Sequence, residues 1–379
     1  MSRNAGGVKM ARFPSRQVAK YRGKAFAIFA SVMLCFAAAG MVLKNASAQE
    51  AKPALRVDDD CSAFAVAPDN SIVYSVPHDR HIKKIHFERD DIWVVEPDGR
   101  KKRIVDGDKF FPPTPPTGFQ VNSFAWSPDG KRIVVNMTVI PASDDPDEPV
   151  GGTRSIALLD GDGNEIKAGA EGKRFIENGI RGTWLADGQT VAYLSQGPPY
   201  RITRVRTLNG QSKVLFEGMA FDDVAWDAKD NAAFVVGHNL TAFGKLGLME
   251  LNLQNETVRE ISRIEEYQGE LTVSSDARRV GFFLDGDTIE VHELADPLKP
   301  IRTKAGLGRF EFGKDGRRVM LKRGPDEKSA DLVWVGLTDG SFTPILHDLE
   351  FHNFQIAPDG NSIAVTMVGK RVLLVYPLN

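Results

Sequence analysis

Cysteine is almost absent from this sequence, which has only Cys35 and Cys61 in 379 residues. A chain with so few cysteines has no network of disulfides, so core packing must hold it together. Helical periodicity is also missing after residue 43, where no segment sustains it over about 12 positions. The 35 glycines and 21 prolines favour many turns instead.

The standard sequence signatures of enzymes are absent too. We find no Gly-x-Ser-x-Gly elbow, no Ser-x-x-Lys, no His-Glu-x-x-His, no Walker loop and no Gly-x-Gly-x-x-Gly. We therefore expect a protein without catalytic activity or cofactor. An enzyme that assembles its site from scattered loop residues stays open as the alternative.

Acidic residues are missing from the first 48 positions. Residues 1–24 carry seven Lys or Arg, the apolar run 25–43 follows, and Ala46 and Ala48 stand where a signal peptidase reads small side chains. We expect residues 1–48 to be an export signal removed after Ala48. The apolar run also reaches the length that spans a bilayer, so an uncleaved membrane anchor facing the periplasm is the alternative.

Removal of this signal changes the charge of the protein. The whole chain has 48 Lys and Arg against 50 Asp and Glu, and residues 1–48 hold eight of the basic residues. The remainder has 40 basic and 50 acidic residues, a formal charge near −10. A surface of this sign repels phosphate backbones, so we expect no nucleic-acid partner.

A turn motif recurs seven times along the chain. The stretch FAWSPDGKRIVV (124–135) has relatives such as FAVAPDNSIVYS (64–75) and FQIAPDGNSIAVT (354–365). The spacing averages about 48 residues, within the range of propeller and solenoid repeats. Alternating apolar residues on both sides of a Pro-Asp-Gly turn predict a β-hairpin. The turn position holds aspartate in six copies and lysine in the seventh: Asp69, Asp129, Asp187, Asp276, Asp315, Asp359 and Lys229.

A second hairpin follows the first in these units, as in DIWVVEPDGRKKRIV (91–105) and DLVWVGLTDGSFTPIL (331–346). Each unit then has four strands. Seven such units predict an all-β, seven-bladed β-propeller with four-stranded blades over residues 50–379. The last unit lacks its outer strand, and PALRVDD (53–59) precedes the first unit. We expect residues 53–59 to pair with 371–376 and close the ring.

The WSPDGKxI pattern at 126–133, with six weaker copies, resembles the WD40-like (PD40) repeat of TolB-type propellers. The resemblance implies an exported, usually periplasmic, propeller that binds partners. It does not extend to TolB itself, because the separate N-terminal α/β domain of that family is not matched.

The longest connections between strands are expected on the face opposite the aspartate turns. Most of these long connections belong to the first two repeats, where they are the segments 77–90, 137–153 and 106–120. Long loops on a rigid scaffold are where binding is expected. We therefore predict partner binding there.

Three clusters of polar residues could carry chemistry. The first, 77–91, holds His78, Asp79, His81 and His86 and could gather a zinc or copper ion, although its spacing matches no closed zinc motif and a solvated loop is the alternative. The second, DGDGNEIKAGAE (160–171), resembles a calcium loop with Asp160 and Asp162 as ligands. It lacks the required glycine at its sixth position, so a plain hairpin turn is the alternative.

The third cluster, SDDPDEP (143–149), gathers acidic side chains and prolines, and a solvated loop tip is the plain interpretation. A cation site or a docking strip for a basic partner is the alternative. Its acidic residues are Asp144, Asp145, Asp147 and Glu148.

The sequence therefore predicts an exported, monomeric binding propeller whose partner is a protein or cell-envelope component. The residues expected at the partner surface are His78, Asp79, His81, Asp144, Asp145, Asp147 and Glu148. The rival is a lactonase or other hydrolase with a metal at the mouth of the channel.

Overall fold

The computed structural model describes residues 52–378. Thirteen short gaps interrupt this range, at 83–84, 112–116, 142–150, 168–173, 196–200, 207–209, 218–219, 228–230, 239–245, 287, 305–308, 327–328 and 370. The predicted export signal lies outside the described residues. Within them, no helix is both long and apolar enough to cross a membrane.

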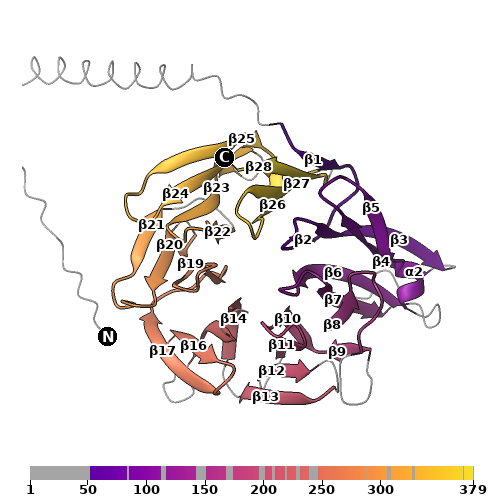
Figure 1. Ribbon diagram of the computed structural model, residues 1–379, viewed down its shortest axis with the longest axis horizontal. Helices are drawn as coiled ribbons and strands as arrows, with labels where there is room; N and C mark the ends of the chain where they lie inside the picture. The colour runs from indigo at the N-terminus through magenta and orange to yellow at the C-terminus, as the bar shows by residue number, and fades with distance from the viewer. Residues whose placement is uncertain are drawn as a thin grey trace, which may run out of the picture. The chain divides into compact units, whose positions relative to one another are not determined.

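Residues 52–378 form a ring of antiparallel sheets around a common centre (Figure 1). Four sheets of four consecutive strands follow one another from the middle of the chain onward. The first contains β10 (Gly179–Trp184), β11 (Thr190–Ser195), β12 (Arg201–Arg206) and β13 (Ser212–Glu217), and the second contains β14 (Ala220–Asp227), β15 (Ala232–His238), β16 (Leu246–Asn252) and β17 (Thr257–Ile264). The third contains β18 (Thr272–Val273), β19 (Arg279–Asp285), β20 (Thr288–Glu293) and β21 (Ile301–Lys304). The fourth contains β22 (Phe310–Phe312), β23 (Arg318–Asp326), β24 (Ser329–Gly336) and β25 (Phe342–Leu349).

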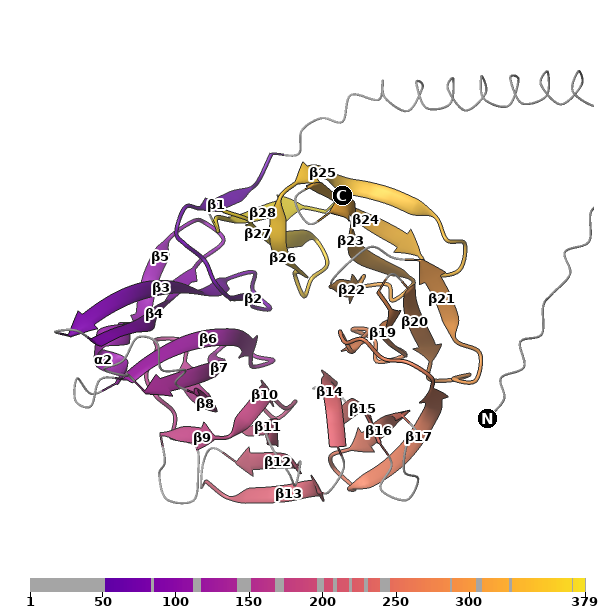
Figure 2. The ribbon, with the colours of Figure 1, turned by 180° about the vertical axis from the view of Figure 1, so that it is seen from behind.

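The fifth four-stranded sheet joins the two ends of the described chain. It contains β26 (Phe351–Ile356), β27 (Ser362–Met367), β28 (Leu373–Pro377) and β1 (Leu55–Val57). Strand β1 pairs antiparallel with β28, with Leu55 opposite Val375. The predicted pairing of 53–59 with 371–376 is confirmed, and Figure 2 shows the closure from behind.

The prediction of seven separate four-stranded blades is wrong, because the structure has five four-stranded blades and one larger sheet. The larger sheet has eight strands. They are β2 (Phe64–Val66), β3 (Ile72–Ile82), β4 (Ile85–Val95), β5 (Lys101–Val105), β6 (Thr117–Trp126), β7 (Arg132–Pro141), β8 (Thr153–Asp160) and β9 (Phe175–Glu177), with a short helix α2 (Gly107–Phe110) between β5 and β6.

The two halves of this sheet join because β5 is too short to cover β4. It pairs only with Ile92–Val95, which leaves the first half of β4 without a partner on that edge. Strand β6 runs parallel to this free edge, with Phe119 opposite Arg89. Gly118 permits the close approach, since a Cβ there would lie 2.8 Å from the carbonyl oxygen of Glu88.

The segment 77–90 is not the long loop that the sequence predicted. Strands β3 and β4 continue through it, with a ladder that reaches His81 opposite His86 and Ile82 opposite Ile85. Alternation of polar and apolar residues is weak in this segment, so the pattern did not reveal the strands.

The repeated aspartates build the hairpin turns, as predicted. Each described copy accepts a hydrogen bond from the backbone N–H two residues later, at 2.8–3.1 Å; these are Asp69, Asp129, Asp187, Asp276, Asp315 and Asp359. Such bonds fix the corner of the turn. Lys229 lies outside the described residues.

Neighbouring sheets are linked where their innermost strands would otherwise leave backbone groups unpaired. Within the larger sheet, the Trp126 indole of β6 likewise donates to the carbonyl oxygen of Ala65 in β2 at 3.1 Å. Gln355 accepts the N–H of Val66 at 3.0 Å, and Glu311 accepts that of Ile356 at 2.7 Å. These contacts hold the inner strands in fixed register around the ring.

Candidate functional site

Three hollows open on the face opposite the aspartate turns. Those turns follow the innermost strands, so the beginnings of the same strands lie at the other face. The hollows have volumes of about 620, 460 and 330 Å³, and we call them the first, second and third hollow. Arg309 lines the first and the second, and His352 lines the first and the third, so the hollows are neighbours that share lining residues.

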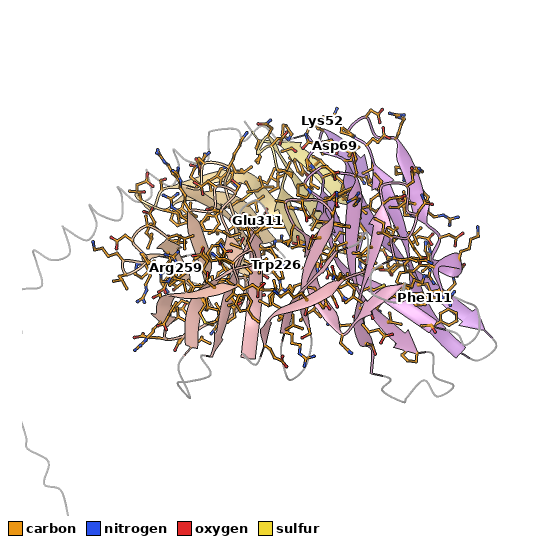
Figure 3. All side chains as sticks on the ribbon, turned by 60° about the horizontal axis from the view of Figure 1, so that its bottom comes forward. Lys52, Asp69, Phe111, Trp226, Arg259 and Glu311 are labelled. Atoms are coloured by element: carbon orange, nitrogen blue, oxygen red, sulfur yellow. The ribbon has the colours of Figure 1, made fainter. Side chains whose placement is uncertain are left out.

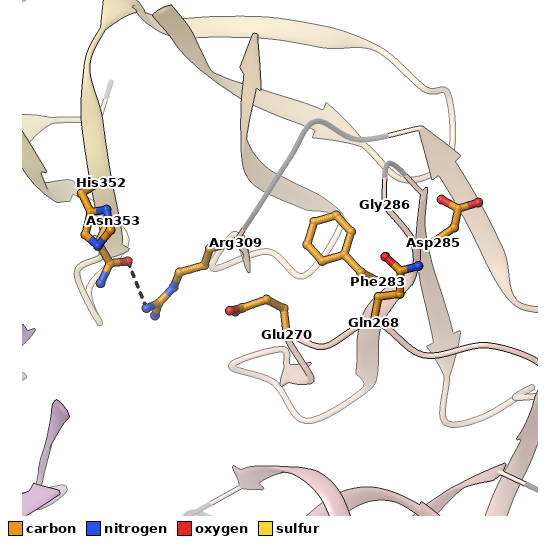
Figure 4. A pocket seen from close by; sticks show the side chains of 8 residues that line it. All are labelled: Gln268, Glu270, Phe283, Asp285, Gly286, Arg309, His352 and Asn353. Atoms are coloured by element: carbon orange, nitrogen blue, oxygen red, sulfur yellow. Dashed lines mark hydrogen bonds between the residues drawn. The ribbon is translucent and has the colours of Figure 1, made fainter. Parts of the chain in front are cut away.

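The first hollow lies between β18, β19, β22 and β26, and Figure 4 shows the eight residues that line it. Glu270 and Arg309 point into it from the beginnings of β18 and β22 (Figure 4). The polar wall also includes the amides of Gln268 and Asn353, the carboxylate of Asp285 and the imidazole of His352, whereas Phe283 is buried. This lining suits a polar ligand better than an apolar one.

Two partly buried side chains hold Arg309 in place. Its Nη2 donates to Glu311 Oε1 at 2.6 Å, and its Nη1 donates to Asn353 Oδ1 at 3.2 Å. Burial raises the pKa of Glu311, although the charge of Arg309 and the N–H of Ile356 lower it. Figure 3 places Glu311 within the ring. The Arg309 side chain as a whole remains 41% exposed.

The second hollow is lined by three arginines, Arg154, Arg181 and Arg309. Arg154 stands at the start of β8 and is exposed. The Arg181 guanidinium donates to Asp223 Oδ1 at 2.8 Å, and it remains 56% exposed while the Asp223 side chain is only 4% exposed.

Asp223 is also bound from behind. Its carboxylate accepts the hydroxyl of Tyr267 at 2.7 Å and the N–H groups of Val224 and Leu271 at 2.8 and 3.3 Å. Burial and the nearby Asp223 charge raise the pKa of Tyr267, which therefore stays a hydrogen-bond donor. Asp223 thus positions Arg181 from inside the protein.

A charged residue in left-handed backbone conformation lines each hollow. Glu270 has φ of 58°, Arg181 of 54° and Arg371 of 44°. A side chain in this region costs about 1–3 kcal/mol and persists where the surrounding structure enforces it. Positive φ also occurs at turns of the opposite face, at Asn70, Glu256 and Ala277. On the face with the hollows it coincides with charged residues in a concave lining, which makes this face a candidate binding surface.

The third hollow contains Cys61, the only cysteine of the described residues. Its side chain is buried, and burial raises the pKa of the thiol well above its usual value. The Sγ donates weakly to the carbonyl oxygen of Ala63 at 3.6 Å. A neutral, buried thiol of this kind is unreactive.

The predicted histidine cluster lies elsewhere, on the β3–β4 hairpin. His78 Nε2 is 3.4 Å from Asp91 Oδ2, which also accepts from Arg103 at 3.1 Å. Asp79 lies on the same strand, opposite Glu88. The side chains of His81 and His86 are outside the description. Among the described side chains, no three His, Cys, Asp or Glu gather as metal ligands would.

Residues 160–167 of the possible calcium loop form the hairpin turn that the sequence also indicated, and 168–171 lie outside the described residues. Asp160 ends β8 and accepts the N–H groups of Asp162 and Asn164 at 2.9 and 2.8 Å. Asp162 pairs with Lys102 at 2.6 Å. The Asp160 carboxylate is therefore engaged by the turn itself, and that of Asp162 by Lys102 of β5. The acidic residues Asp144, Asp145, Asp147 and Glu148 lie outside the described residues.

Sequence reasoning missed Arg181, Glu270 and Arg309, which are far apart along the chain. One signal was available: Glu311 and Gln355 occupy the same position of two repeat copies, FEFGKDG and FQIAPDG. A long polar side chain at a position that holds alanine or threonine in the other copies indicates a specific contact. The N–H groups that Glu311 and Gln355 accept belong to equivalent residues of the next sheet.

No family model matches the chain, and no curated protein matches it. Among solved structures, a prolyl endopeptidase aligns with 85% of this chain at 13% identity and a TM-score of 0.57. This chain spans 50% of the length of that one. The β-propeller domain of Cps50 (Swd1) from Myceliophteria thermophila aligns with 85% of this chain and 97% of its own, at 10% identity and a TM-score of 0.53.

TolB from Acinetobacter baumannii aligns with 81% of this chain and 80% of its own, at 11% identity. Its TM-score of 0.44 is too low to support an argument. The stronger two matches agree with the β-propeller fold of this chain. At such identities they show the fold alone, and no family model supports the repeat family that the turn motif resembles.

Proposed function

We propose that this protein is an exported binding propeller that engages a protein or cell-envelope component with the face carrying the three hollows. The observation behind the proposal is the presence of strained, charged residues in the lining of every hollow: Glu270, Arg181 and Arg371. The opposite face instead uses its repeated aspartates to close turns. Binding residues are commonly presented in this way, on a rigid scaffold.

Export rests on the sequence of residues 1–48, with its basic start, its apolar run and its small residues before position 49. The periplasm is the compartment that this signal favours. A chain with one cysteine beyond residue 48 can form no internal disulfide there, in keeping with a ring held by packing and strand pairing.

Site-specific photocrosslinking tests which face binds. A photoreactive amino acid at Ser123, exposed in the second hollow, is expected to capture an envelope partner in living cells. The control is the same amino acid at Lys131, exposed at an aspartate turn. Capture from position 131 but not from 123 would place binding on the face of the aspartate turns and would contradict the proposal.

Deletion of residues 142–150 tests whether this segment belongs to the partner surface. This segment contains the acidic residues that the sequence assigned to the partner surface. If the deletion abolishes crosslinking from position 123 while the fold persists, the partner surface extends to that segment. Unchanged crosslinking restricts the surface to the hollows.

A further inference from the structure

The charged side chains that line the second hollow are all positive, whereas residues 49–379 as a whole are acidic. Its charged lining consists of Arg154, Arg181 and Arg309, and no acidic side chain lines it among the residues described. By contrast, residues 49–379 carry an excess of ten acidic residues. A concave site of one sign attracts ligands of the opposite sign. Asp223 and Glu311 balance two of the three arginines from outside the lining, but only guanidinium groups carry charge in the lining itself, which therefore favours an anion.

The arginines are oriented before any ligand arrives. Arg181 is fixed by Asp223, and Arg309 is fixed by Glu311 and Asn353. A guanidinium has five N–H donors, so each retains donors that these bonds do not use. Both groups are about half exposed, at 56% and 41%. Preorganised arginines suit planar, bidentate anions, of which carboxylate is the common example in proteins.

The neighbouring surface suits a polypeptide. Ser123 and Asn122 add a hydroxyl and an amide beside the arginines. The first hollow shares Arg309 with the second, and there Gln268 and Asn353 present further amides. Glu270 and Asp285 also line the first hollow, so acidic side chains of a peptide are expected in the second hollow only. Amide side chains can bond both the N–H and the C=O groups of an extended backbone.

We infer that the second hollow binds the carboxylate side chains of an acidic peptide segment of the partner, with Arg154, Arg181 and Arg309 as anchors. This inference rests on the proposed function. A peptide fits better than a nucleic acid, because the overall negative charge of the protein repels a long phosphate backbone.

Fluorescence anisotropy with labelled hexaglutamate tests the inference on the purified protein. The double variant R154Q/R181Q is compared with R201Q/R259Q, which changes the charge equally at exposed arginines of β12 and β17. Arg259 matches Arg181 in side-chain exposure, at 56%. We expect R154Q/R181Q to weaken binding at least about tenfold. The control R201Q/R259Q should bind hexaglutamate as tightly as the parent does. Added salt should weaken the binding of hexaglutamate to the parent and to the control.

Several results would overturn the inference. They are tighter binding of hexalysine, equal binding by R154Q/R181Q and the parent, or displacement of hexaglutamate by a deoxythymidine hexamer or millimolar inorganic phosphate. The single variant R154Q serves if the double variant does not fold, since Arg154 is exposed. Crosslinking from position 123 is independent of these measurements, so the proposed function can stand when the acidic-peptide inference fails.

Discussion

At the scale of single residues, Asp90 is the most unusual carboxylic acid of the fold. It is 1% exposed, and Oδ2 accepts the N–H of Val121 at 2.8 Å while Oδ1 has no partner among the described residues. Burial raises its pKa to about 7, with the charges of Glu88 and Asp91 adding to the increase. Asp90 therefore binds its proton more tightly in the folded state than in the unfolded chain.

The sign of the pH effect follows from this raised pKa. The folded protein holds the extra proton between about pH 4 and 7, so stability from Asp90 is greatest at low pH and declines as pH rises. We expect Asp90→Asn to raise the free energy of unfolding by about 1–2 kcal/mol at pH 8. At pH 5 the gain should be smaller.

Urea unfolding at the two pH values measures this difference. Asp58→Asn, at a carboxylate whose side chain is 67% exposed, is the control and should show neither gain. A loss of stability in Asp90→Asn at pH 8 would mean that the carboxylate form is needed where β4 meets β6.

Glu290 shows the opposite behaviour. It is buried, which alone raises its pKa, but the hydrogen bonds and charges of His292 and Arg302 outweigh burial and lower it. His292 Nε2 lies 2.9 Å from Glu290 Oε1, and Arg302 Nε lies 2.7 Å from Oε2. A lowered pKa adds stability at pH values above the pKa of the unfolded chain. This stability is lost as the pH falls through the pKa of the folded protein.

We expect Glu290→Gln to cost roughly 2 kcal/mol at pH 7, because the buried His292 and the half-exposed Arg302 lose the carboxylate that they bond. The cost should shrink as the pH falls below 4.5, where the parent also loses its carboxylate. Thermal unfolding across this range measures it. Glu217→Gln, at a half-exposed ion pair with Arg201, should be nearly neutral at every pH.

At the scale of elements, β1 is the strand on which ring closure depends. Val57 is 2% exposed and packs with Tyr74 and Leu373 in one buried cluster. The strand also covers the edge of β28, which would otherwise be free to pair with other molecules.

A chain beginning at Asp58 should therefore be less stable than a chain beginning at Lys52, by at least about 3 kcal/mol from lost apolar burial and strand pairing. It should also self-associate through β28. Urea unfolding and sedimentation compare the two. Equal stability of the two chains would show that the ring does not need this strand.

At the scale of the whole molecule, the prediction concerns residues 1–48. We expect export to remove them, so that the protein found in the periplasm begins at Gln49. Ala48→Tyr should block this processing, because the peptidase needs a small residue there. Ser47→Tyr is the matched control, since its side chain is not read. Intact-mass measurement of fractionated cells distinguishes the products, and an unprocessed parent chain would favour the membrane anchor.

Much of the fold follows from local patterns in the sequence. The aspartate turns recur with nearly constant chemistry, so each hairpin could be predicted from its own few residues. The closing pair of strands could also be predicted, because the last repeat lacks one strand and an extra strand stands before the first. These features depend on short-range preferences and on counting.

The sequence alone determined an all-β ring, its turns and its closing strand. Only the tertiary structure decided how many separate blades the ring has and where the hollows lie. The number of separate blades depends on close approaches such as Gly118 against Glu88, which no local pattern encodes. The position of the hollows depends on Arg181, Glu270 and Arg309, which become neighbours only when the ring closes and brings the beginnings of distant strands to one face.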